Sequence, residues 1–385
     1  MKGGNMYTST IIFRSLLIHA AALLLVLAAA PASAREFASK EHTISLTVVA
    51  NGLENPWAIA FLPGGDILVS ERPGRLRIVR DGNLLPGSVE GLPQIRALGQ
   101  GGLLDLLPHP DFATNKLLYF SYAANFGSGV TTHVGRGKFE GDALKDVEVL
   151  FRAEPASSGR VHFGSRLAFD GQGYLYISVG DRGEMDRAQK LDDHAGKIIR
   201  IHDDGRIPED NPFVGETGAW SEIFSYGHRN AQGMAVHPQS GEVWIHEHGP
   251  RGGDEINIIR PGANYGWPVV TLGIDYTGFT IGDGLRHMPG MDDPLHSWTP
   301  SIAPSGMAFY TGDAFSRWKG DLFVGALAHR HLARLKLSGD VVVEEERLLE
   351  NLRLRIRDVR VGPDGNLWLL TDHDPGQLLR LEPAD

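Results

Sequence analysis

Cysteine is absent from the 385 residues of this chain. Its absence excludes disulfides, cysteine-ligated zinc, iron–sulfur clusters and haem attached through a C-x-x-C-H motif. Basic runs are also lacking and the formal net charge is -10, which argues against nucleic acid as a partner. The chain has no G-x-S-x-G elbow, P-loop or Rossmann glycine fingerprint, so serine-hydrolase, ATPase and nicotinamide functions have little support.

Long apolar runs are scarce as well, and the one that exists lies near the N-terminus. The sequence SLLIHAAALLLVLAAA (15–30) follows the basic residues Lys2 and Arg14 and precedes Ala32-Ser33-Ala34. This order predicts a cleaved signal peptide over 1–34 and export, most simply to a bacterial periplasm. An uncleaved anchor is the alternative, but the run is short for a bilayer. No later segment is apolar enough to span a membrane, so we expect no stable membrane insertion.

One short pattern is repeated along the rest of the chain. An apolar residue and a turn rich in Pro, Gly or Asp precede a strand-like run, and the copies begin at Phe61, His109, Phe169, His237, Trp318 and Gly362. Six copies predict an all-β, six-bladed β-propeller that forms a single domain over 35–385. A β-sandwich or β-helix explains repeats of this length less well. The long segments 182–227 and 264–304 are expected to be decorated loops on the active-site face.

The segment 225–267 holds the densest group of polar candidates. Arg229 and Asn230 are donors suited to an anionic, oxygen-rich ligand. The loop that starts at Gly249-Pro250 and ends at Glu255 offers carbonyls and carboxylates, which suit a hard cation such as calcium. It lacks the EF-hand spacing, and an ordinary Asp/Gly turn is the alternative.

His162 and Asp181 flank another predicted blade strand. A histidine that is oriented by an acid is a competent general base near neutral pH. From the local sequence alone, a structural loop histidine bonded to backbone is the alternative. The nearby motif His246-Glu247-His248 resembles a zinc site but lacks the H-E-x-x-H spacing, and structural strand histidines explain it better.

Arginines alternate in the sequence LRLRIRDVR. Alternation places Arg355 and Arg357 on one face of a strand, in a row that Arg353 continues. Two guanidinium forks on one face suit carboxylates; a solvated basic edge paired with Asp358 or with 344–346 is the alternative. Gln100 and Trp298 are further candidates to line a sugar or cofactor pocket, and most such residues are structural.

Taken together, these segments resemble the soluble quinoprotein glucose and aldose sugar dehydrogenases. The similarity covers nearly the whole predicted mature chain in order, through NPWAIAFLPGGDILVSER, GQGGLLDLLPHPDF, the His162 and GDRG segment, GHRNAQG, EHGPRGGDEIN, NYGWP, PSIAPSGM and RIRDV. It implies a six-bladed propeller that uses pyrroloquinoline quinone (PQQ) and calcium. It favours the catalytic interpretation of His162 over the structural one.

The resemblance also implies residue roles. His162 matches the base that takes the proton of the anomeric hydroxyl, and Asp181 matches the acid that orients it, while hydride passes to C5 of PQQ. Arg229 and Asn230 match contacts to the quinone, and Arg229 would stabilise negative charge that develops on its oxygen. The other implied contacts are Gln100, Arg355 and Arg357 to the cofactor, the Gly249 and Pro250 carbonyls to the catalytic calcium, Glu255 and the Tyr265 carbonyl to a structural calcium, Tyr276 on the cofactor side of the pocket, and Trp298 on the substrate side.

One position departs from the family pattern. Glucose-type members have a Lys near the cofactor where this chain has His329. A histidine can still donate to a carboxylate, but it carries less charge near neutral pH. This difference and the shorter loops favour the aldose sugar dehydrogenase branch, with a monomer or a dimer both open.

The sequence thus predicts a periplasmic quinoprotein that oxidises aldoses at C1 to lactones. Because the chain has no haem motif, electrons would leave to a separate quinone or cytochrome. A calcium-dependent lactonase on the same kind of propeller is one alternative. A non-enzymatic propeller that binds sugar or protein is the other.

Overall fold

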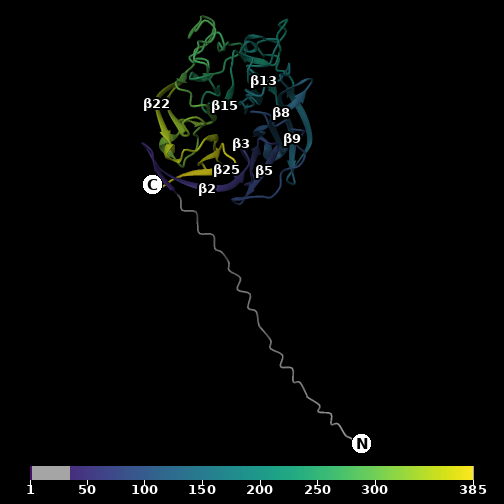
Figure 1. The fold of residues 1–385 in the computed structure, drawn as a ribbon, viewed down its shortest axis with the longest axis vertical. Coiled ribbons are helices and arrows are strands. Elements are labelled where there is room, and N and C mark those ends of the chain that lie inside the picture. The colour runs from purple at the N-terminus through teal and green to yellow at the C-terminus, as the bar shows by residue number, and fades with distance from the viewer. Residues whose placement is uncertain (2–34, 385) are drawn as a thin grey trace. The chain divides into compact units, whose positions relative to one another are not determined.

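The computed structural model describes residues 1 and 35–384, so the predicted signal peptide lies, Met1 aside, outside the described residues. Residues 35–384 form six antiparallel sheets whose innermost strands pack side by side in a closed ring (Figure 1). The six-bladed β-propeller predicted from the repeats is confirmed. None of the described residues forms a helix long and apolar enough to cross a membrane.

Each sheet starts at the centre of the ring and runs outward. The first three sheets, from inner to outer strand, are β3 (Pro56–Phe61), β4 (Ile67–Glu71), β5 (Arg75–Arg80) and β6 (Asn83–Leu84); β7 (Leu103–Pro108), β8 (Leu117–Phe126), β9 (Gly129–Glu140) and β10 (Ala143–Arg152); and β11 (Leu167–Phe169), β12 (Tyr174–Val179), β13 (Lys197–His202) and β14 (Ile223–Tyr226).

The next two sheets have the same order, and the last one includes the N-terminal strands. They are β15 (Ala231–Val236), β16 (Val243–Glu247), β17 (Asp254–Ile258) and β18 (His296–Trp298); β19 (Pro304–Phe309), β20 (Leu322–Ala326), β21 (Leu332–Ser338) and β22 (Val341–Leu348); and β23 (Ile356–Val361), β24 (Leu367–Thr371), β25 (Gly376–Pro383), β2 (Thr43–Leu53) and β1 (Arg35–Ala38). The short helical elements are α1 (Phe112–Asn115), η1 (Met185–Gln189), η2 (Ser316–Trp318) and η3 (Glu350–Leu352).

The ring is closed by the two ends of the described domain. β2 pairs with β25 in a register that runs from Ile44 opposite Pro383 to Leu53 opposite Gly376 (Figure 1). The last sheet is therefore built from both ends of the domain. This pairing removes two free strand edges and ties the first blade to the last.

The repeated turn of the sequence has one structural role throughout. Each copy lies between the innermost strand of a sheet and the second strand. In the last copy, the Gly362 N–H donates to the Asn366 carbonyl at 2.8 Å, and the Gly365 N–H donates to the Gly362 carbonyl at 3.0 Å. Gly365 has φ +75°, which glycine adopts without strain. The Pro/Gly/Asp turns therefore fix the hairpin that starts every blade.

The hydrophobic core lies between the blades. The six largest clusters of buried apolar side chains among the described residues each join two neighbouring sheets. For example, Trp244 of β16 packs edge-on against Phe309 of β19, with ring centroids 5.3 Å apart. Because both faces of a blade are covered, the second strands β4, β20 and β24 are buried at every residue. This explains why they are apolar runs rather than alternating ones.

Candidate active site

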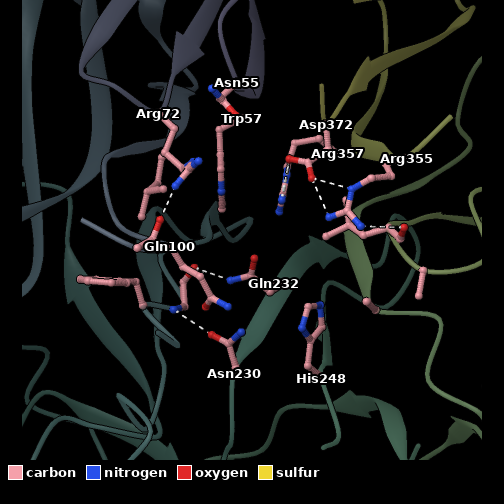
Figure 2. Close-up of a pocket in the computed structure, with 17 residues that line it drawn as sticks. Asn55, Trp57, Arg72, Gln100, Asn230, Gln232, His248, Arg355, Arg357 and Asp372 are labelled. Carbon is pink, nitrogen blue, oxygen red and sulfur yellow. Dashed lines mark hydrogen bonds and ion pairs between the residues drawn. The ribbon is translucent and has the colours of Figure 1, made fainter. Parts of the chain in front are cut away.

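A cavity of about 440 Å³ lies at the end of the ring where the innermost strands begin (Figure 2). All six innermost strands contribute a residue at or just before their start, namely Trp57, Gln100, Gly164, Asn230, Ala303 and Arg357. The blades therefore bring together side chains that are far apart in the sequence. The predicted loop segment 182–227 is only partly loop, because it contains η1, β13 and β14.

Arginine is the main charged residue of this cavity. Arg72, Arg355 and Arg357 line it, against the single carboxylate of Asp372. Arg355 donates to Oδ2 of Asp372 through Nε and Nη2 at 2.9 and 2.7 Å, and Arg357 donates to Oδ1 at 3.0 and 2.7 Å (Figure 2). The predicted pair of guanidinium forks thus lies in a pocket, not on a solvated edge.

The partners considered for a basic edge are engaged elsewhere. Asp358 forms ion pairs with Arg166 and Arg360, and Glu346 forms one with Arg334. Arg353, the third member of the alternating row, is exposed and follows η3. Only two of the three arginines therefore reach the cavity.

Asp372 stabilises this arrangement through its own charge. Burial raises the pKa of Asp372, but the charges and hydrogen bonds of Arg357 and Arg355 outweigh burial and lower the pKa to about 2. A depressed acid pKa contributes stability above the ordinary pKa of an aspartate, and this contribution is lost as the pH falls through the folded value.

We therefore expect Asp372→Asn to lower the free energy of unfolding by about 2–3 kcal/mol at pH 7. The difference from wild type should shrink between about pH 4 and pH 2, where the wild-type carboxylate also becomes protonated. Denaturant unfolding at a series of pH values measures the loss of unfolding free energy at pH 7 and its decrease at acid pH. The exposed pair Lys319–Asp313 is the control, since Asp313→Asn should cost much less. An Asp372→Asn effect that does not change with pH would contradict this origin.

His162 and Asp181 form a direct pair beside the cavity. The backbone N–H of His162 donates to Oε1 of Gln100 at 2.8 Å. The next two residues, Phe163 and Gly164, line the cavity. Nδ1 of His162 lies 2.6 Å from Oδ1 of Asp181. Because a carboxylate only accepts, Nδ1 carries the proton, and in the neutral imidazole the lone pair is then on Nε2. The side chain of His162 is 15% exposed, whereas that of Asp181 is 1% exposed.

Asp181 is held as an ionised acceptor. Its Oδ1 also accepts from the Gly183 N–H at 2.7 Å, and its Oδ2 accepts from Nε1 of Trp267 at 2.8 Å. Burial raises the pKa of Asp181, but the hydrogen bond and charge of His162 and the Gly183 N–H together bring it below the ordinary value. The pair therefore has the geometry of a base and its orienting acid.

The side chains of the neighbouring residues Arg229 and Asn230 point in different directions. Asn230 lines the cavity, and its Oδ1 accepts from the Gly164 N–H at 3.1 Å. Arg229 is buried against the ring of Trp267, and its Nη1 donates to the carbonyls of His248 and Gly249 at 3.0 and 3.1 Å. The Gly249 carbonyl, a predicted calcium ligand, is thus bonded to Arg229 in this structure.

A second, much smaller space lies behind Arg229. Its volume is about 10 Å³, which is the room that one water or ion needs, and its lining includes Glu247, Glu255 and Tyr265. Burial and the charge of Glu247 raise the pKa of Glu255 to about 8. Among the described residues no group of three or more acids and histidines is placed to hold a metal, so a cation here would also need backbone carbonyls.

The loop that joins β16 to β17 is fixed by a carboxylate. Oδ1 of Asp254 accepts from the Gly249 N–H at 2.8 Å, and its Oδ2 accepts from the N–H groups of Ile302 and Ala303 at 2.7 and 2.9 Å. Gly249 and Pro250 are both buried in this loop. Asp254 is therefore used by the protein itself to shape the loop.

Three further predicted site residues, Tyr276, His329 and Trp298, are not among those that line the cavity. Tyr276 is 67% exposed on the loop between β17 and β18, and His329 is exposed at the turn between β20 and β21. Trp298 is only 4% exposed, because β18 pairs with β17 and turns this ring into the core; its Nε1 donates to Glu345 at 3.1 Å. The structure therefore places Trp298 in a packing role rather than in a substrate pocket.

Sequence reasoning missed several residues of the cavity. They are Asn55, Trp57, Arg72, Gln232, His248 and Asp372. The sequence pattern favours a structural role for His248 over zinc binding, and Nε2 of His248 bonds to the Pro304 carbonyl at 2.6 Å, while burial lowers its pKa to about 3. For Asp372 a signal existed, because Glu71, Asp181 and Glu247 also stand at the end of the second strand of a blade.

Comparison with known proteins agrees with this geometry. The family model described as Glucose / Sorbosone dehydrogenase matches residues 53–380. The aldose sugar dehydrogenase YliI of Escherichia coli (strain K12) is 45% identical over 89% of this chain and 94% of its own length. The crystal structure of the soluble aldose sugar dehydrogenase from Escherichia coli in the apo-form has a TM-score of 0.86 at 44% identity, covering 88% of this chain and 99% of that one.

A third relative has been solved with a ligand. The structure of the PQQ-bound form of aldose sugar dehydrogenase from Streptomyces coelicolor is 30% identical, with a TM-score of 0.72, and covers 88% of this chain and 98% of that one. The family match extends over most of the described domain and includes every strand that contributes to the cavity. This chain therefore belongs to the Glucose / Sorbosone dehydrogenase family of oxidoreductases.

Proposed function

We propose that this protein is a periplasmic dehydrogenase that uses PQQ and calcium to oxidise aldose sugars at C1 to lactones. The observation that carries the proposal is the His162–Asp181 pair, 2.6 Å apart, beside a cavity lined by three arginines. The names of its relatives support a sugar as substrate. A lactonase needs no anion-binding arginines, so the cavity favours the dehydrogenase over that alternative.

The cavity fits an anionic quinone cofactor. Arg355 and Arg357 would bind carboxylates of PQQ with the donors that Asp372 leaves free, and Gln100 and Asn230 add amide groups. Trp57 supplies an aromatic surface in the same cavity. The PQQ-bound relative has this fold. Bound PQQ would supply the two-electron oxidant, and calcium would polarise it as a Lewis acid.

Two places suit calcium by the chemistry of their donors. The carbonyls of Gly249 and Pro250 would hold the catalytic ion, and the Gly249 carbonyl is the one that Arg229 now contacts. The small space lined by Glu255 and Tyr265 would hold a structural ion, since a divalent cation offsets the repulsion between Glu255 and Glu247.

The residues of the chain would handle the proton. Nε2 of His162 is free to accept the proton of the sugar hydroxyl at C1, because Nδ1 donates to Asp181. The ionised Asp181 stabilises the imidazolium that results and fixes the orientation of the ring. Trp267 and Gly183 hold Asp181 in place through the oxygens described above. Electrons would then leave to a separate quinone or cytochrome.

A dye-reduction assay on the mature protein tests the proposal. Glucose and a panel of aldoses are offered with PQQ and calcium together, with each alone, and with neither. Activity that needs both additives is the expected result. Lactone hydrolysis without sugar oxidation would favour the lactonase, and sugar binding without either reaction would favour a non-enzymatic propeller.

Removal of calcium should also lower stability. We expect a chelator to reduce the melting temperature and added calcium to restore it, because an ion that binds only the folded state stabilises it. Glu255→Gln should weaken this calcium-dependent shift, since it removes a charged ligand from the small space. Glu216→Gln, at an exposed position, is the matched control and should retain the full shift. A melting temperature that does not respond to calcium would rule out the structural site.

A further inference from the structure

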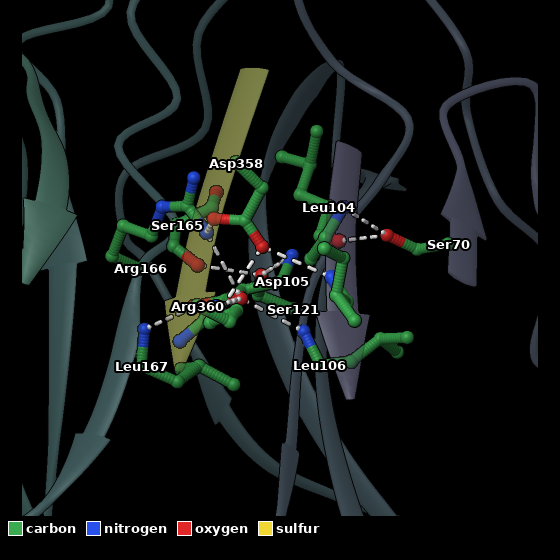
Figure 3. A network of polar contacts seen from close by, with 12 residues as sticks. Ser70, Leu104, Asp105, Leu106, Ser121, Ser165, Arg166, Leu167, Asp358 and Arg360 are labelled. Carbon is green, nitrogen blue, oxygen red and sulfur yellow. Dashed lines mark hydrogen bonds and ion pairs between the residues drawn. The ribbon is translucent and has the colours of Figure 1, made fainter. Parts of the chain in front are cut away.

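Four charged residues meet among the innermost strands of the ring (Figure 3), and three of them are buried. This axial ionic cluster consists of Asp105 of β7, Arg166 just before β11, and Asp358 and Arg360 of β23. Nη1 of Arg166 lies 3.2 Å from Asp105 and 2.9 Å from Asp358. Arg360 completes the cluster with contacts of 2.7 Å to Asp105 and 3.0 Å to Asp358. Two positive and two negative charges therefore balance one another within the cluster.

The remaining innermost strands close around the cluster. The Ile59 N–H of β3 donates to Oδ2 of Asp358 at 3.0 Å. On β19, a Cβ added to Gly306 would lie 2.3 Å from Oδ1 of Asp358, so only glycine allows the strand to come this close. The cluster thus fixes the spacing of strands from several blades at once.

Arg166 reaches from this cluster to the floor of the cavity. Its Nε donates to the Gln232 carbonyl at 2.6 Å, and its guanidinium lies 4.1 Å from the centre of the Trp57 ring. Its Nη2 is 3.5 Å from the Arg357 carbonyl. Gln232, Trp57 and Arg357 all line the cavity. A single buried side chain therefore connects the charge cluster with three residues of the site.

Arg166 also ends a strained stretch of backbone that carries His162. His162 and Ser165 have φ of 52° and 81°, and Gly164 between them has φ of 61°. Left-handed backbone is costly for residues other than glycine and persists only where its surroundings enforce it. Here Nε2 of Gln232 donates to the Gly164 carbonyl at 3.0 Å, and Oγ of Ser121 donates to the Ser165 carbonyl at 2.6 Å.

We propose that Arg166 is a positioning residue for the reaction: anchored in the axial ionic cluster, it fixes the strained backbone of 162–165 and so holds His162 against Asp181. Loss of its side chain would leave Asp105 and Asp358 with one cation instead of two. It would also release the Gln232 carbonyl and the Trp57 ring. The backbone of 162–165 would then relax, although Arg166 touches neither His162 nor Asp181. The kinetic part of this inference rests on the proposed function, whereas the structural part does not.

The test compares two equally buried arginines. Arg166 is 2% exposed and Arg334 is 1% exposed. Arg334 forms ion pairs with Glu41, Asp321 and Glu346 at 2.8–2.9 Å within the outer part of the fifth sheet and its neighbour, away from the cavity. Both variants therefore break a buried ion network. Arg166→Met does so next to the cavity, whereas Arg334→Met does so away from it.

Two readouts are measured on the mature protein, with and without PQQ and calcium. Hydrogen–deuterium exchange reports the His162, Gly164 and Ser165 amides, which Gln100, Asn230 and the Ser178 carbonyl protect. In Arg166→Met we expect these amides to exchange at least about tenfold faster. We expect kcat to fall by about a hundredfold, because a small displacement of a reacting group has an effect of this size. Arg334→Met should leave both unchanged even if it unfolds more easily.

Arg166→Lys keeps the charge but loses the fork, so it should lie between wild type and Arg166→Met in both readouts. It also serves if Arg166→Met does not fold. The proposal would be overturned if the amides of 162–165 exchanged at the wild-type rate in the tested Arg166 variant. It would also be overturned if Arg334→Met showed the same increase in exchange and the same loss of kcat. If the wild-type protein oxidises no sugar, the proposed function fails, while exchange still decides the role of Arg166.

Discussion

Replacement of His162 by Gln is expected to lower kcat for aldose oxidation by about 10²–10⁴-fold, the usual contribution of a general base. The side-chain amide of Gln can still donate an N–H to Asp181, and so replaces the hydrogen bond that Nδ1 of His162 makes at 2.6 Å. It has no basic lone pair to accept the proton of the C1 hydroxyl. Binding of PQQ should change little, because the arginines that would hold it are untouched. Dye reduction gives kcat, and the quinone absorbance of the reconstituted protein gives binding.

The chain offers a matched control for this variant. His287 and Asp293 form another histidine–aspartate pair, with Nδ1 2.9 Å from Oδ1, but both side chains are exposed. His287→Gln should keep wild-type activity. If His162→Gln retained activity within about twofold of wild type, a base role for His162 would be wrong. A similar loss in both variants would indicate a general effect of histidine replacement rather than a site at His162.

The fold was predictable because its information is local. Each blade begins with a turn of Pro, Gly and Asp between an inner strand and an apolar second strand, as at 61–67 and 361–367. Turn chemistry and strand pattern are visible over about ten residues, and six copies leave few other architectures. The pairing of β2 with β25 is different in kind, since it joins residues more than 300 positions apart. Nothing in the local pattern of 43–53 specifies that partner.

The candidate site was only partly predictable. Gln100, Asn230 and Arg357 were predicted from the sequence and line the cavity, because each lies at or near the start of an inner strand. Asp372 was overlooked because a lone aspartate after an apolar strand resembles a turn residue. Its equivalence to Asp181 at the end of a second strand becomes clear only when the blades are aligned. Trp298 shows the opposite error, since its strand pairing turns the ring into the core.

The axial ionic cluster could not be predicted at all. Asp105 interrupts the apolar strand β7, where a single charge looks unfavourable, and Asp358 lies among arginines of its own strand that suggest a local partner. Arg166 and Arg360 compensate them only because β7, β11 and β23 converge in the centre of the ring. A buried charge in one strand is thus informative only together with its partner in another blade.

Asp181→Asn should reduce kcat by about as much as the loss of the base, even though it changes one atom. All of the bonds described for Asp181 are accepted, from His162, Gly183 and Trp267. An asparagine has one carbonyl oxygen and one NH₂ group. If the oxygen faces His162, the NH₂ group meets the N–H of Trp267. If the amide is flipped, its NH₂ group faces Nδ1 of His162, and Nδ1 must then accept a hydrogen bond. The ring proton therefore moves to Nε2, and Nε2 can no longer act as the base.

This conflict gives the prediction a sharp test. Trp267→Phe removes the opposing donor, so an asparagine at 181 could then turn its oxygen to His162 and its NH₂ group to the ring of Phe. We therefore expect the double variant Asp181→Asn, Trp267→Phe to be more active than Asp181→Asn alone, although Trp267→Phe by itself lowers kcat. A double-mutant cycle on kcat measures the coupling. Additive losses would mean that Asp181 acts through its charge alone, and not by fixing the tautomer of His162.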